Sequence, residues 1–260
     1  MTRQIEFDPG KDAKNWAKHK NTIVKDSNAA VFDAAAGAYD QLQRDNLGCF
    51  GGDLSFFAEY KIALTRKLVP NEPENILEFG CGVGRNLPFL QHYFPNSRIS
   101  GCDVSGESLA LAGKAAPEAD LALTADPEDF LRCYARSAFG LITAVCVLHH
   151  IPEKTRADWL SALYATLRPG GTLLIFEHNP YNPLTRRIFN TCPFDAGAKM
   201  LSPGAARNLL RHTGFVDLFG RYTLFFPWRG KAWRGLETAL GRLPLGGQYF
   251  LKAGRPEAGA

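Results

Sequence analysis

The sequence predicts an α/β fold, in which a mostly parallel seven-stranded sheet carries helices on both faces. Short apolar segments alternate with segments whose apolar residues recur every three or four positions, which is the pattern of strands connected by helices. A glycine-rich turn at 80–84 directly follows the first apolar segment of this series, as expected where a strand turns sharply into a helix. The chain has 260 residues and 45% hydrophobic residues, enough to build one large core.

Two helices are predicted before the sheet, and they form a helical cap over residues 1–70. The apolar spacing places these helices at about 28–45 and 53–69. The sheet domain then spans 71–260. Its strands are expected at about 75–79, 97–102, 120–124, 140–147, 171–177, 215–226 and 247–253. Its helices are expected at about 85–94, 105–115, 127–134, 153–167 and 202–213, with a basic, aromatic-rich insertion near 227–244.

The turn after the first strand is the most informative motif. Gly80, Gly82 and Gly84 follow Glu78, and glycine permits positive φ and removes the Cβ atoms that would keep a cofactor away from the backbone. About twenty residues later, Asp103 ends the second strand. An acid at that position accepts hydrogen bonds from the ribose hydroxyls of a nucleoside cofactor.

The spacing of the glycines distinguishes between cofactors. A dinucleotide fingerprint requires its third glycine three residues after the second, and that position is Arg85. The spacing therefore argues against an NAD-dependent oxidoreductase.

With these motifs, residues 74–178 resemble the class I S-adenosylmethionine (SAM)-dependent methyltransferases, and the flanking segments resemble a bacterial small-molecule subset of that family. The resemblance implies a Rossmann-like sheet, SAM as the cofactor and a SAM-dependent methyltransferase activity. It implies that the cofactor-binding residues are Tyr39, Glu78, Gly80, Gly82, Gly84, Asn86, Asp103, Val104, Asp126, Val145 and His150. Several of these have a purely structural alternative: the three glycines as a plain tight turn, Asp103 as a helix cap, Asp126 as an N-cap before Pro127, Asn86 as a helix-start residue and Tyr39 as a core residue.

Three histidines are candidates for acid–base chemistry. His149 and His150 end the fourth strand and His178 ends the fifth, and histidine titrates near neutrality. The alternative is that they shape the loop or pack on the cofactor. A base is needed only if the acceptor is a protonated, weakly acidic group.

The loop after the fifth strand is the predicted acceptor site, because it is polar and stiffened by prolines. The candidate substrate-binding residues are Glu177, His178, Asn179, Tyr181 and Arg186. Arg186 also fits a solvated helix face. No ligand spacing of a recognised type accompanies Glu177, His178 and Asp195, so no metal is predicted.

The predicted function is methyl transfer by in-line displacement to a small molecule, for example a glycan-, lipid- or secondary-metabolite-related acceptor. The alternatives are a non-catalytic SAM-binding protein and a SAM-fold transferase of another reaction class. Six scattered cysteines and the absence of an apolar N-terminal leader favour a cytoplasmic protein. The formal net charge of +4 is mild and no nucleic acid partner is expected. The segment 227–244 fits peripheral membrane contact, a capping helix or a homodimer contact.

Overall fold

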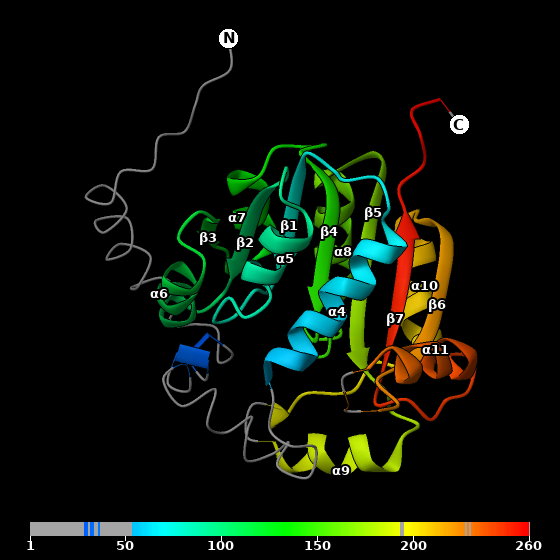
Figure 1. Cartoon of the computed structure of the whole chain (residues 1–260). Coiled ribbons are helices and arrows are strands. Elements are labelled where there is room, and N and C mark those ends of the chain that lie inside the picture. The colour runs from blue at the N-terminus through cyan, green and yellow to red at the C-terminus, as the bar shows by residue number, and fades with distance from the viewer. Residues whose placement is uncertain are drawn as a thin grey trace.

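A seven-stranded sheet forms the centre of the molecule (Figure 1). The computed structural model describes residues 29–30, 32–33, 36, 54–192, 195–226, 228 and 230–259. The strand order is β3-β2-β1-β4-β5-β7-β6. The strands are β1 Asn75–Phe79, β2 Arg98–Asp103, β3 Asp120–Leu123, β4 Phe139–Val145, β5 Leu167–His178, β6 Val216–Thr223 and β7 Gln248–Gly254.

The sheet is parallel except for one strand. β1 pairs in parallel with both β2 and β4, while β7 runs antiparallel between β5 and β6. The strand order therefore reverses between β1 and β4, and a crevice opens beyond the carboxyl ends of these two strands. The predicted seven-stranded, mostly parallel sheet is confirmed.

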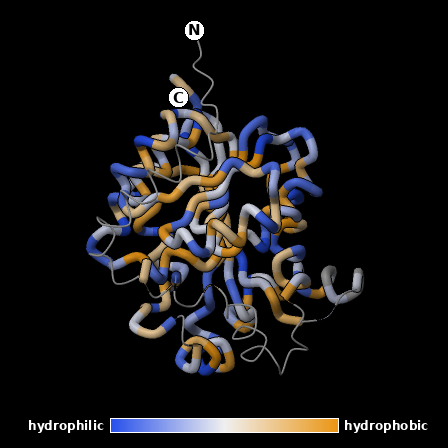
Figure 2. Tube along the Cα trace, turned by 90° about the vertical axis from the view of Figure 1, so that its left-hand side faces the viewer, coloured by the Kyte–Doolittle hydropathy of each residue, from blue (hydrophilic) through white to orange (hydrophobic). Residues whose placement is uncertain are grey.

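Helices cover both faces of the sheet, as predicted. On one face α4 Leu54–Leu68, α5 Leu87–Tyr93 and α6 Gly106–Ala115 contribute Ile62, Leu90 and Leu109 to a shared core. On the other face α7 Pro127–Cys133, α8 Arg156–Thr166 and α10 Pro203–Thr213 contribute Phe130, Trp159 and Leu210. In Figure 2 the apolar colour is concentrated along the trace inside the molecule. Burial on both faces explains why the central strands read as continuous apolar segments.

One helix was not predicted from the sequence. The polar loop predicted after β5 leads into α9 Pro183–Thr191. The 227–244 insertion contains α11 Lys231–Leu240, in agreement with the capping-helix interpretation of that segment. α9 begins at Pro183 because the Asn182 side chain accepts hydrogen bonds from the backbone N–H groups of Leu184 and Thr185, with proline at the first helical position. β5 also starts at Leu167, four residues before the predicted start.

Part of the predicted N-terminal cap lies outside the described residues. This applies to Tyr39 and to most of the helix predicted at 28–45. α4, the second predicted cap helix, packs against α5 and the sheet. Within the described residues, no helix is both long and apolar enough to cross a membrane.

Candidate active site

A cavity of about 420 Å³ lies at the carboxyl ends of the central strands. One end is formed by the loops after β1 and β2, and the other by α4, α9 and the segments on either side of α11. In Figure 1 α9 lies below the lower ends of β4 and β5, and α4 crosses in front of the sheet with its N-terminal end near these strand ends. The cavity is therefore in the crevice that the strand order creates.

The glycine-rich loop forms one wall of the cavity, and the structure explains separately why each position is a glycine. All three have positive φ, at +69° for Gly80, +54° for Gly82 and +77° for Gly84. A Cβ on Gly80 would lie 2.5 Å from Val147, and one on Gly84 would lie 2.7 Å from the Ala112 backbone. A Cβ on Gly82 would meet nothing within 4 Å. Gly82 therefore leaves open space where the cavity begins, whereas the other two glycines allow close internal packing.

Asp103 holds the same loop from the end of β2. Its Oδ2 accepts a hydrogen bond from the Gly82 N–H at 2.8 Å, and its Oδ1 accepts one from the Ser105 N–H at 2.9 Å. Burial raises the pKa of Asp103, although these backbone donors counteract the shift. The carboxyl group lines the cavity, so the loop and the acid predicted from their spacing do meet.

Glu78 lies beneath this loop with one oxygen satisfied and one not. Asn86 Nδ2 donates to Oε1 at 2.5 Å, while no hydrogen-bond partner for the buried Oε2 exists among the described residues. Burial raises the pKa of Glu78 to about 8, against the opposing effects of Asn86 and Lys61. A carboxyl oxygen buried in this way requires a hydrogen-bond partner that the described protein does not supply.

Polar groups not predicted from the sequence line the opposite end of the cavity. They include Lys61 from α4, Cys146 after β4 and Gln248 at the start of β7. Burial lowers the pKa of Lys61. Gln248 Nε2 donates to Cys146 Sγ at 3.2 Å, and its buried Oε1 has no partner among the described residues.

Little in the sequence marks Cys146 or Lys61 as a site residue, although each has one unusual feature in the structure. Cys146 has a φ of +56°, which is uncommon and strained for a residue other than glycine. Lys61 is a lone basic residue among the apolar positions of α4.

Apolar side chains surround these polar groups. They belong to α4, α9 and the segment after β6, and they are Leu54, Phe57, Leu184, Ile188, Phe189, Leu224, Phe225 and Phe226. Leu184 and Leu245 line the cavity and are nonetheless 46% and 61% exposed. These two residues therefore mark an apolar rim at the mouth.

Glu237 of α11 fixes one side of this apolar end. Its Oε1 accepts hydrogen bonds from the N–H groups of Phe225 and Phe226 at 3.0 and 3.2 Å. Its Oε2 accepts one from the Tyr60 hydroxyl of α4 at 2.6 Å. Tyr60 also bonds the Thr223 hydroxyl at the end of β6.

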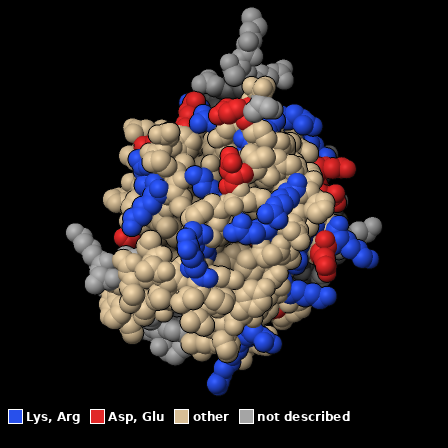
Figure 3. All heavy atoms as spheres, turned by 90° about the vertical axis from the view of Figure 1, so that its right-hand side faces the viewer, with Lys and Arg blue, Asp and Glu red and all other residues tan. Residues whose placement is uncertain are grey.

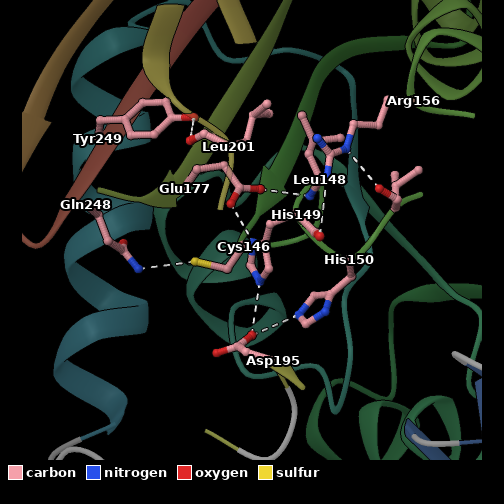
Figure 4. A network of polar contacts seen from close by, with 11 residues as sticks. Cys146, Leu148, His149, His150, Arg156, Glu177, Asp195, Leu201, Gln248 and Tyr249 are labelled. Atoms are coloured by element: carbon pink, nitrogen blue, oxygen red, sulfur yellow. Dashed lines mark hydrogen bonds and ion pairs between the residues drawn. The ribbon is translucent and has the colours of Figure 1, made fainter. Parts of the chain in front are cut away.

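A buried network of imidazole and carboxylate groups lies beside the cavity (Figure 4). His149 Nδ1 is 2.6 Å from Glu177 Oε2, and His149 Nε2 is 3.2 Å from Asp195 Oδ1. Burial by itself would lower the pKa of His149, but the two carboxylates outweigh it and raise the pKa to about 9. Glu177 Oε1 accepts a further hydrogen bond from the Leu148 N–H at 2.8 Å.

The three predicted acid–base histidines occupy different positions. His150 and His178 line the cavity, whereas His149 is buried behind them. Burial and the neighbouring His149 lower the pKa of His150 to about 3 and that of His178 to about 4. Both cavity-facing imidazoles are therefore neutral at physiological pH and offer an electron pair.

Several predicted site residues lie away from the cavity lining. Asp126 caps α7 by accepting a hydrogen bond from the Asp129 N–H at 2.8 Å. Asn179 is buried and donates to the Pro244 and Gly246 carbonyls at 3.0 and 2.8 Å. Tyr181 and Arg186 are exposed, because the chain enters α9 here and directs them outward. Glu177 reaches the cavity only through His149.

Other predicted cofactor residues do face the cavity. Gly80, Gly82, Asn86, Asp103, Val104, Val145 and His150 belong to its lining. Gly84 and Glu78 support the loop from behind.

Comparison with known proteins agrees with this geometry. Residues 77–173 match the methyltransferase domain family. The chain is 31% identical over 167 residues to a trans-aconitate 2-methyltransferase of Azoarcus sp., which covers 62% of this chain and 63% of that protein. It is 27% identical over 151 residues to a demethylmenaquinone methyltransferase of Thermus thermophilus, covering 58% of this chain and 65% of that one. The matched part thus spans slightly less than two thirds of either relative.

A solved structure has the same fold. A SAM-dependent methyltransferase from Thermotoga maritima superposes with a TM-score of 0.64 at 16% identity, covering 88% of this chain and 99% of that chain.

Proposed function

We propose that this chain, whose residues 77–173 match the methyltransferase domain family, is a class I SAM-dependent methyltransferase. It transfers the methyl group of SAM to a small molecule with an apolar body and a hydrogen-bonding group. The observation that carries this proposal is the division of one cavity into two ends. The glycine cradle and Asp103 form one end, and an apolar chamber with the buried oxygen of Gln248 forms the other.

The cofactor end has the groups that SAM requires. The open space beside Gly82 admits a ligand against the backbone, and Asp103 offers a carboxylate for the ribose hydroxyls. The unsatisfied Glu78 Oε2 offers an acceptor for an ammonium group. SAM, when bound, supplies a methyl group made electrophilic by its sulfonium. The task of the protein is then to orient the acceptor and to exclude water.

The acceptor end favours a small, largely apolar molecule. Phe225, Phe226 and Ile188 offer apolar contact, while Gln248 Oε1 can accept a hydrogen bond from an acceptor hydroxyl or amine. The neutral His178 lines the same cavity, so its ring nitrogen can accept a hydrogen bond from that group. The names of the two relatives, a trans-aconitate and a demethylmenaquinone methyltransferase, support a small-molecule acceptor.

A lipid-linked acceptor is favoured by the mouth of the cavity. Leu184 and Leu245 are exposed at the rim, and Trp228, Trp233 and Leu236 are exposed on or beside α11. Lys and Arg cover more of the face shown in Figure 3 than Asp and Glu do. Arg186 of α9 and Arg242 are exposed and lie close in the sequence to Leu184 and Leu245. Apolar side chains beside basic ones suit the surface of an anionic membrane.

Vesicle sedimentation tests the membrane contact. We expect the protein to sediment with vesicles containing anionic lipid, and Leu184→Glu/Leu245→Glu to weaken this binding several-fold at constant salt. Equal sedimentation of both proteins, or none of either, would contradict the membrane contact.

The cofactor is tested by calorimetric titration with S-adenosylhomocysteine, with NADH as control. We expect micromolar affinity for the former alone. Binding of NADH instead would contradict the assignment.

Methyl transfer is tested with labelled SAM and a panel of acceptors that includes trans-aconitate and a demethylmenaquinone analogue. We expect turnover with an apolar hydroxyl- or amine-bearing acceptor, and a raised KM in Gln248→Leu. Binding of S-adenosylhomocysteine without turnover on any acceptor would favour a non-catalytic SAM-binding protein.

A further inference from the structure

Donor atoms from three separate segments converge beside the acceptor end of the cavity. His149 and His150 follow β4, Glu177 belongs to β5 and Asp195 follows α9. In Figure 4 both histidine rings turn toward the Asp195 carboxylate. The Nε2 atom of His149 is 3.2 Å from Asp195 Oδ1, and that of His150 is 3.4 Å from the same oxygen. These three atoms all lie within 4.8 Å of one another.

The hydrogen bond to Glu177 defines which nitrogen of His149 is available. Glu177 accepts from the Leu148 N–H through Oε1, so its Oε2 is directed at His149 Nδ1 at 2.6 Å. A proton on Nδ1 satisfies this contact. In the metal-free chain the two carboxylates raise the pKa of His149 to about 9, so Nε2 carries a second proton, which it donates to Asp195. A metal ion that takes this position displaces that proton, as metal binding to histidine does in general.

The charge of the cluster points to the same conclusion. Among the described residues, neither Glu177 nor Asp195 forms an ion pair with lysine or arginine, and both carboxylates contact histidine. Two carboxylates removed from water need positive charge nearby. The protonated His149 supplies one positive charge in the metal-free chain, and a divalent cation at the point where the donors meet supplies two.

We propose that His149 Nε2, His150 Nε2 and Asp195 Oδ1 bind a divalent transition-metal ion, with zinc the best match to this donor set. Nitrogen and oxygen ligands 2.0–2.2 Å from a tetrahedral ion are separated by about 3.3–3.6 Å, close to the 3.2 and 3.4 Å measured here. Glu177 provides the carboxylate that typically orients a metal-binding histidine through its other nitrogen.

Three protein ligands leave a fourth coordination position open, as in catalytic zinc sites. His150 and Asp195 line the cavity, so this position faces the acceptor end. Resting on the proposed function, an oxygen atom of the acceptor is the group that would occupy it. The sequence predicted no metal because Asp195 lies 46 residues from His149 and no recognised spacing joins them.

Metal binding can be measured without any acceptor. The full chain is treated with a chelator, dialysed and titrated with Zn²⁺ by calorimetry, and Co²⁺ is used to record visible absorption bands. We expect one equivalent per chain. His150→Ala and Asp195→Asn should each weaken binding by at least about 10-fold, and Glu177→Gln by about 10- to 100-fold. His92→Ala, which removes an exposed histidine far from the cluster, should bind as the native chain does.

Two results would overturn the site. One is the absence of stoichiometric Zn²⁺ binding by the native chain. The other is binding that survives unchanged in both His150→Ala and Asp195→Asn. Melting of each metal-free variant shows that it is folded before titration, and the milder Asp195→Asn retains the size of the side chain. Titration with S-adenosylhomocysteine on the same samples separates this proposal from the proposed function, because cofactor binding does not require the metal.

Discussion

The two ends of the cavity are constructed differently. The cofactor end is local: Glu78, the glycine loop and Asp103 come from β1, β2 and the turn between β1 and α5. The acceptor end is assembled from distant segments, with Lys61 on α4, Asp195 after α9 and Gln248 on β7. The first end depends on backbone geometry that short motifs encode. The second depends on tertiary packing, which allows the acceptor to change while the cofactor end is kept.

The largest expected effect separates two aspartates that the sequence treated alike. Asp103→Ala removes a cavity carboxylate, and we expect the affinity for S-adenosylhomocysteine to fall about 100-fold, since hydrogen bonds to a charged group are worth about 1.5–3 kcal/mol each. The matched variant Asp126→Ala removes the N-cap of α7. It should lower the stability by about 1 kcal/mol and leave the affinity nearly unchanged. Calorimetry measures the affinity and thermal melting measures the stability. If both variants lost the same affinity, Asp103 would have no special role in cofactor binding.

At the acceptor end, Lys61→Met should reduce methyl transfer by about tenfold or more while increasing stability. Burial lowers the pKa of Lys61, so the charged form opposes folding at pH values below its folded-state pKa. The gain in melting temperature should therefore shrink as the pH rises toward 10.5, the ordinary lysine value. Lys67→Met on the exposed side of the same helix is the control. Unchanged turnover in Lys61→Met would remove Lys61 from the acceptor end.

Alanine at Gly82 and at Gly84 should have contrasting effects. Gly82→Ala places a methyl group in open space at a φ of +54°, so we expect a loss of about 1–2 kcal/mol in stability and about a tenfold loss of S-adenosylhomocysteine affinity. Gly84→Ala collides with the Ala112 backbone and should mainly impair folding. Melting curves and titrations distinguish the two outcomes. Full affinity in Gly82→Ala would mean that the cofactor does not approach this part of the loop.

The smallest expected effect is a pH dependence of cofactor binding. Glu78 has a pKa of about 8 when buried, and Asn86, Lys61 and Asp103 are the polar groups that influence it. An ammonium group favours the ionised carboxylate, so affinity for S-adenosylhomocysteine should rise about threefold or more from about pH 6 to about pH 8. The stability of the ligand-free protein depends on pH in the opposite direction. Because the folded state raises the pKa of Glu78, the free energy of unfolding decreases as the pH rises from 4.5 toward 8. Glu78→Gln should abolish the pH dependence of affinity, and a slope that persists in this variant would assign it to another group.

The sequence predicted the fold well because the signals of the sheet are local. Alternating apolar strands and periodic helices indicated all seven strands, and the N-cap at Asp126 was already an alternative to its cofactor role. The short α9 was missed because its start depends on Asn182 and Pro183 within a segment that reads as a polar loop.

In the candidate site, the residues of local motifs were predicted from the sequence, whereas the residues brought together by tertiary contacts were not. Gly82 and Asp103 lie where a strand–turn–helix motif must place them. Asn179 resembles a substrate ligand in sequence, but it binds the backbone at Pro244 and Gly246. Asp195 and Gln248 acquire their roles only when the chain brings β4, β5 and β7 together, and no spacing along the chain records that contact.

The hydrogen bonds of Glu237 connect the two ends of the cavity thermodynamically. Glu237 holds the backbone at Phe225 and Phe226 and, through Tyr60, holds the helix that carries Lys61. We therefore expect an acceptor that displaces the phenylalanine segment to displace α4 as well, and Lys61 of α4 lies close enough to Glu78 for their charges to interact. The free energies of binding of cofactor and acceptor are then coupled, and each ligand should change the dissociation constant of the other by the same factor.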